Sequence, residues 1–148
     1  MIPAVPIPPA EMDRSDEVGA AAAAEYFMRL QTYVLQTGDL ADWDARSGDA
    51  CGFCSNVHDQ VARVYGSGGS FTGFNVTVHD VEVLGQDPTL GVFSVEVGFA
   101  LDGGDELDAA GMDVGGFAED AGTVILDVIP SVHGWVLTGG NAQGGAQQ

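Results

Sequence analysis

The stretch CSNVHDQVARVYGSGGSFTGFNVTVHDVEV (residues 54–83) decides the fold, because the spacing of its apolar residues changes halfway along. In its first part the apolar residues recur every three or four positions, as on a helix with one buried face. The run from Gly66 to Ser70 ends this pattern, and from Phe74 onward apolar and polar residues alternate as in a half-buried strand. The change predicts helices before residue 66 and a sheet after it.

The segment before this stretch predicts two further helices. An apolar stripe extends over residues 18–37 and ends at Gly38, a typical residue just past a helix C-terminus; it contains Ala23, Tyr26, Phe27, Leu30, Tyr33 and Val34. Leu40 and Trp43 can share one side of a short second helix. The third helix is expected over residues 50–65, with Cys54 on its inner face.

The segment after it predicts an antiparallel meander. The alternation changes phase at His79-Asp80, as a β-bulge would require, and residues 95–101 alternate cleanly. A turn is expected at 102–105, and residues 106–120 are ambiguous, with a short strand around 107–114. The final strand pair is expected at 123–129 and 135–138. Helices packed on one face of a curved antiparallel sheet define an α+β fold of the cystatin-like cone type.

The ends of the chain differ in composition from this middle part. Residues 1–17 are rich in proline and acidic residues, so they are expected to form a flexible tether; residues 18–140 form a single cone domain; residues 141–148 are expected to form a disordered Gly/Gln tail. A Met followed directly by a proline-rich run is interpreted as a mature segment from which an export signal has been removed.

The charge balance excludes two classes of function. The chain has 4 Lys+Arg against 22 Asp+Glu, a formal net charge of -18. Binding a nucleic-acid backbone or anionic lipid headgroups requires cationic side chains, so neither nucleic acid nor direct peripheral membrane binding by the domain is expected. An acidic surface favours solubility and attracts cationic partners.

The order of elements and several local motifs resemble known domains. The cone arrangement resembles nuclear-transport-factor-two-like, or SnoaL-like, domains. The sequence Thr37-Gly38-Asp39, the pair Cys51-Gly-Phe-Cys54, the helix end at Tyr65-Gly66 and the strand Gly134-Trp135-Val136 together resemble a family of small actinobacterial envelope lipoproteins of unknown function. The resemblance covers residues 18–139. It implies an extracellular or cell-envelope protein that is lipid-anchored in its full-length precursor, although the lipobox cysteine of that family is absent here.

The Cys51-Gly-Phe-Cys54 motif has three interpretations. Cysteines three apart in a first helical turn lie within disulfide range, and pairing is the default in an exported protein with only 2 cysteines. A redox function is the second interpretation, but the motif does not follow a buried parallel strand as it does in thioredoxins. A metal site is the third, with His58 as the only nearby additional ligand. The disulfide is favoured.

Seven residues are candidates for the lining of a pocket in the cone: Tyr26, Leu30, Trp43, Tyr65, His79, Asp80 and Trp135. His79 and Asp80 could also form a catalytic acid–base pair, and Asp127 is a further candidate for a buried ionisable group. A Gly-rich turn carries several acidic residues that suggest a weak calcium site, but their spacing does not match an EF-hand and favours a solvated acidic loop: Asp102, Asp105, Glu106, Asp108 and Asp113.

These observations predict a non-catalytic exported envelope protein that uses neither a cofactor nor a metal. The domain would bind a small apolar ligand in its cavity or an unknown partner protein, as an accessory subunit of an envelope complex would; a homodimer through the sheet face stays open. An enzyme of the SnoaL-like isomerase or hydrolase kind is the alternative. A haloarchaeal cytoplasmic domain is the second alternative, because the chain lacks lysine and is rich in Asp.

Overall fold

The fold is described from a computed structural model, for residues 4–143. A short 3-10 helix, η1 (Ala10–Asp13), precedes three helices: α1 (Glu17–Thr37), α2 (Ala41–Ala45) and α3 (Gly52–Gly66). Seven strands follow: β1 (Ser70–Gly73), β2 (Val76–Gln86), β3 (Phe93–Leu101), β4 (Gly104–Leu107), β5 (Asp113–Phe117), β6 (Asp120–Ser131) and β7 (Gly134–Gln143). The predicted order of helices first and strands second is confirmed.

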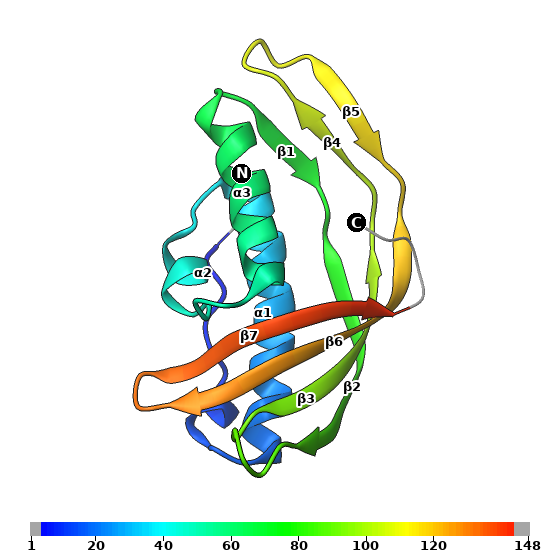
Figure 1. Cartoon of the computed structure of the whole chain (residues 1–148). Helices are drawn as coiled ribbons and strands as arrows, with labels where there is room; N and C mark the ends of the chain where they lie inside the picture. Colours follow the sequence, from blue (N-terminus) through cyan, green and yellow to red (C-terminus); the bar gives the residue numbers. More distant parts are fainter. Residues whose placement is uncertain (1–3, 144–148) are drawn as a thin grey trace.

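The strands form two antiparallel sheets. The larger sheet has the order β2-β3-β6-β7 and the smaller has the order β1-β4-β5. Figure 1 shows the larger sheet curving across α1, while the smaller sheet faces the far end of the two long helices, α1 and α3. The protein is therefore an open α+β structure in which helices pack against two antiparallel sheets, as the sequence predicts for the fold class.

The two sheets correct the prediction of one continuous meander. The β4–β5 hairpin leaves the larger sheet and pairs with β1 instead, so β3 lies next to β6. The chain bends sharply between β1 and β2, where Gly73 and Phe74 both have positive φ values of 84° and 62°. This bend separates β1 from β2 and directs β1 toward the β4–β5 hairpin. The predicted β-bulge is confirmed as a register shift between Val78 and Asp80.

The first long helix is fixed at both ends and buried along one side. The Asp16 side chain accepts a hydrogen bond from the Gly19 backbone N–H at 3.3 Å and caps the N-terminus. Gly38 ends the helix with φ 75°, a conformation that glycine adopts without strain. The buried side carries Ala20, Ala23, Ala24, Phe27, Leu30 and Val34. Small alanine side chains let the sheet approach the helix closely.

The N-terminal segment is attached to the domain over part of its length, unlike the flexible tether predicted for residues 1–17. Met12 in η1 is buried, and the indole Nε1–H of Trp135 donates to the carbonyl oxygens of Met12 (3.0 Å) and Arg14 (3.1 Å). A buried indole needs such partners, and the backbone of this segment supplies them. The predicted tail also begins too early, because β7 extends to Gln143; residues 144–148 lie outside the described residues, as do residues 1–3.

Candidate ligand-binding cavity

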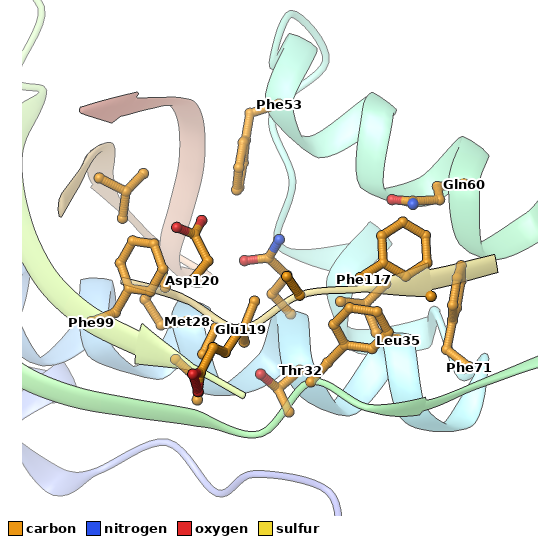
Figure 2. Close-up of a pocket in the computed structure, with 17 residues that line it drawn as sticks. Met28, Thr32, Leu35, Phe53, Gln60, Phe71, Phe99, Phe117, Glu119 and Asp120 are labelled. Atoms are coloured by element: carbon orange, nitrogen blue, oxygen red, sulfur yellow. The ribbon is translucent and has the colours of Figure 1, made fainter. Parts of the chain in front are cut away.

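A cavity of about 460 Å³ lies between the two long helices, the strands of both sheets and the segment that joins β5 to β6. This volume is in the range of small-molecule sites. Figure 2 shows Phe53 and Gln60 entering from α3, with Met28, Thr32 and Leu35 on α1. The lining consists of Met28, Gln31, Thr32, Leu35, Phe53, Gln60, Phe71, Phe74, Val76, Phe99, Leu101, Gly116, Phe117, Ala118, Glu119, Asp120 and Val124.

The cavity has a buried apolar floor and an exposed mouth. Met28, Phe71, Phe74 and Val124 are buried and form the floor. The mouth is formed by exposed residues of two elements: Gln60 on α3, and Phe117, Ala118 and Glu119 at the end of β5 and just beyond it. An apolar part of a ligand would be buried at the floor, while a polar part would stay near water.

Phenylalanines are the most numerous apolar residues of the lining. Five of the 7 phenylalanines in the chain line the cavity. Phe71, Phe74 and Phe117 contact one another, with ring centroids 5.4–6.4 Å apart. Such edge-to-face and tilted contacts stabilise the rings in fixed positions. The aromatic wall is therefore a formed part of the structure.

Phe53 is held in place by the motif that surrounds it. Cys51 and Cys54 on either side of it form a buried disulfide, which confirms the predicted pairing. The ring of Phe53 lies against the backbone of β7, where a Cβ on Gly140 would approach a ring carbon to 2.7 Å. The disulfide and the glycine together fix the position of one cavity wall.

The polar side chains of the lining are neutral or acidic. Gln31, Thr32, Gln60, Glu119 and Asp120 line the cavity, and no arginine, lysine or histidine does. The four arginines interact elsewhere: Arg14 with Asp16, Arg29 with Glu25, Arg63 with Glu106, and the Arg46 guanidinium 5.2 Å from the Tyr26 ring centroid. An anionic group in the cavity would therefore meet no opposite charge.

None of the seven residues that the sequence suggested as pocket lining lines this cavity. Tyr26, Leu30, Trp43 and Trp135 are buried in the main core, where large aromatic and aliphatic side chains fill the space under the four-stranded sheet. Helical spacing marks a buried face, but it does not distinguish a packed core from a cavity wall. The suggested lining is wrong for that reason.

Tyr65 has a structural role in the same part of the fold. Its hydroxyl donates to the Leu35 carbonyl oxygen at 2.7 Å and accepts from the Phe71 backbone N–H at 3.3 Å. Its ring lies over Gly38 at the end of α1. Burial raises the pKa of Tyr65. The Thr37-Gly38-Asp39 motif is structural as well, since the Tyr33 hydroxyl donates to Asp39 at 2.8 Å, lowering the pKa of that carboxyl.

The suggested acid–base residues lie outside the cavity. His79 and Asp80 contact each other at 3.0 Å on the solvent-exposed side of β2, with the Asp80 side chain 81% exposed. Asp127 on β6 accepts a hydrogen bond from the Ser94 hydroxyl at 2.8 Å. A β-bulge redirects side chains outward here. These three residues therefore form no catalytic group within the cavity.

The remaining candidates of the sequence are also accounted for. The His58 imidazole lies 2.8 Å from the Asp44 carboxylate at the surface, and both cysteines are joined in the disulfide. In the acidic turn, a hydrogen bond with Asp113 raises the pKa of Asp105. Among residues 4–143 no group of three His, Cys, Asp or Glu side chains is arranged to hold a metal ion.

Sequence reasoning missed the segment that closes the cavity. Residues 116–120 were part of the ambiguous region, yet they provide five lining residues. The phenylalanines gave a signal for an aromatic cavity wall. After residue 70 the chain has six aromatic residues, and four of them line the cavity: Phe71, Phe74, Phe99 and Phe117. Their meeting point depends on the β4–β5 hairpin, which the sequence pattern did not specify.

The fold and the cavity define the class: an α+β protein in which helices and two antiparallel sheets surround an apolar cavity. The chain belongs to the DUF6318 family of unknown function, whose family profile matches residues 3–105. No curated protein matches it. Within residues 4–143, no helix is long and apolar enough to cross a membrane.

A solved structure has the same fold. The intermembrane space region of the chloroplast protein ARC6, known from a crystal structure, matches with a TM-score of 0.62 and 15% sequence identity over 87% of this chain and 97% of that chain. At this identity the likeness concerns the fold alone. The nuclear-transport-factor-two-like and actinobacterial resemblances stay predictions.

Proposed function

We propose that this protein is a non-catalytic, exported cell-envelope protein whose domain binds a small apolar ligand in the cavity. The observation that carries the proposal is the cavity itself, with a volume of about 460 Å³, five phenylalanines in its lining and a buried floor. Protein interiors are normally close-packed, so an apolar space of this size is costly unless a ligand fills it. Binding of an apolar molecule would recover the lost contacts.

The distribution of ionisable groups supports binding over catalysis. An acid–base enzyme needs an ionisable side chain held in an apolar pocket. The candidates His79, Asp80 and Asp127 lie outside the cavity, and its floor consists of apolar side chains. Of the two carboxylates that do line it, Glu119 is exposed at the mouth, and Asp120, the first residue of β6, is half-buried. This arrangement suits recognition of a ligand.

The buried disulfide supports the envelope location. Structural disulfides persist in oxidising compartments and are rare in the cytosol. Lipid anchoring of the precursor rests on the lipoprotein resemblance. If the native protein is exported, both cysteines will be unreactive toward a thiol reagent under denaturing, non-reducing conditions. Two reactive thiols in protein isolated from its own cell would contradict export.

Binding in the cavity can be tested with a neutral, environment-sensitive dye such as Nile red and two matched tryptophan substitutions. Leu35→Trp places an indole in the cavity, whereas Leu84→Trp adds the same group at an exposed position of β2. We expect saturable dye binding by the wild type and by L84W, and at least a tenfold loss for L35W, about 1.4 kcal/mol. Equal binding by both variants would locate the dye elsewhere, and absence of binding by the wild type would overturn the proposal.

A further inference from the structure

The polar side chains of the cavity indicate which end group its ligand carries. Two of the lining residues, Glu119 and Asp120, are carboxylates, and no cationic side chain lines the cavity. We infer that the ligand is a cationic amphiphile, an apolar chain or ring that bears an amine or ammonium group. The inference rests on the proposed function, because it names the chemical class of molecule for the same cavity.

The positions of the two carboxylates fit such a molecule. Glu119 lies in the segment between β5 and β6, and Asp120 is the first residue of β6, where it pairs across the sheet with Leu101, which also lines the cavity. In Figure 2 both lie toward Met28 and Phe99, whereas Phe71 and Phe117 lie at the other side of the cavity. Glu119 is exposed and Asp120 is half-buried, so an ammonium group there would keep part of its hydration. The apolar part would then contact the phenylalanines and the floor.

The rest of the cavity excludes an anionic ligand. A carboxylate or sulfate head would lie beside two like charges, and among the described residues no arginine lines the cavity to offset the repulsion. All four arginines of the chain already contact an acidic side chain or, for Arg46, a tyrosine ring. The formal net charge of -18 adds long-range repulsion of anions and attraction of cations. Fatty acids and similar acids are therefore poor candidates.

The amide and hydroxyl groups of the lining are compatible with a cationic head. Gln31, Thr32 and Gln60 each have an oxygen that can accept a hydrogen bond from an ammonium N–H. In Figure 2 Gln60 lies toward Phe71 and Phe117, at the end of the cavity away from the two carboxylates. Gln31 and Thr32 on α1 remain as neutral acceptors for a cationic head.

Three decyl compounds with different heads test the inference: decyltrimethylammonium, decanol and decanoate, each titrated as a competitor of the neutral dye below its micelle-forming concentration. We expect the ammonium compound to bind up to about fivefold more tightly than decanol at low salt, the upper end of the range for exposed charge pairs, and decanoate to bind most weakly. The advantage of the ammonium head should shrink in molar salt because salt screens charges. Equal affinity for all three compounds, or tighter binding of decanoate, would overturn the inference.

Matched variants separate the local carboxylates from the overall charge. In the E119Q/D120N double variant the preference for decyltrimethylammonium over decanol, taken as the ratio of the two affinities in that variant, should disappear. Glu82→Gln removes one charge on the exposed side of β2 and should leave the preference intact. Because Asp120 Oδ1 accepts from the Ala121 backbone N–H at 2.9 Å, the asparagine keeps an acceptor there. If the wild type binds decanol and decyltrimethylammonium equally well, this inference alone is overturned. If none of the three compounds binds to the wild type, the proposed function is overturned.

Discussion

The two ends of this domain are packed differently. Under the four-stranded sheet, α1, α2 and the N-terminal segment enclose a continuous core that includes both tryptophans. Next to the three-stranded sheet, only Val64, Phe71 and Phe74 form a second buried cluster, and the space beside it is the cavity. The first end gives the protein its stability, and the second has room for a ligand because its apolar surface is not covered by the chain itself.

The difference arises from the number of strands that face each part of the helices. Four long strands cover α1 with alternating apolar side chains, so few gaps are left. The smaller sheet has strands of four or five residues, and its outer strand β5 carries Val114 and Phe117 at the surface. A sheet of such short strands does not fill the space between itself and the two long helices. The loosely packed end is therefore where function is expected.

The largest expected effect concerns the packed end. Trp135→Ala removes a side chain that is 2% exposed, together with the indole N–H that holds the carbonyl oxygens of Met12 and Arg14. We expect the free energy of unfolding to fall by about 3–5 kcal/mol, measured by urea denaturation. A loss below about 1 kcal/mol would contradict the assignment of Trp135 to the core.

The disulfide belongs to the main core and flanks Phe53 of the cavity wall, so its removal should affect both ends. In the C51A/C54A variant we expect a loss of about 2 kcal/mol from the increased freedom of the unfolded chain. Phe53 lies between the two cysteines and lines the cavity, so dye affinity should also fall. Reduction of the wild type under native conditions is a matched comparison. If the unfolding free energy and the dye affinity of the variant both equal those of the wild type, the disulfide neither stabilises the fold nor positions Phe53.

At the open end, a substitution should separate binding from stability. Phe117 is 41% exposed and lies at the mouth of the cavity. Phe117→Ala should cost less than about 1 kcal/mol in unfolding free energy, because little buried area is lost, yet weaken dye binding severalfold. The reverse pattern, a large stability loss with unchanged dye affinity, would make this ring part of the packed core.

The smallest effect is expected in the hairpin of the small sheet. The pKa of Asp105 is raised in the folded state by the hydrogen bond with Asp113, so folding is favoured below the ordinary pKa of an aspartate and this contribution is lost as pH rises through the raised value. Asp113→Asn should lower the pKa of Asp105 and flatten the pH dependence of stability between about pH 3 and pH 6. NMR titration of the Asp105 carboxyl would measure this. An unchanged titration would mean that the two carboxyl groups do not interact in solution.

Much of the architecture could be predicted from local patterns. Four features each depend on a few neighbouring residues: the apolar stripe of α1, the glycine at its end, the bulge after Val78 and the alternation of β3. The cavity could not be predicted in this way. Its lining comes from α1, α3, several strands and a loop, and the sequence does not show whether an apolar residue meets a neighbour or an empty space.

The sequence by itself predicted that helices precede strands and favoured the pairing of Cys51 with Cys54, because these follow from spacing and proximity. Only the tertiary structure decided that Trp43, Trp135 and Tyr26 fill the core while phenylalanines surround the cavity. The physical reason is that burial is a property of the whole packing arrangement. The β4–β5 hairpin pairs with β1, and the cavity lies beside this small sheet. No local sequence pattern predicts that pairing.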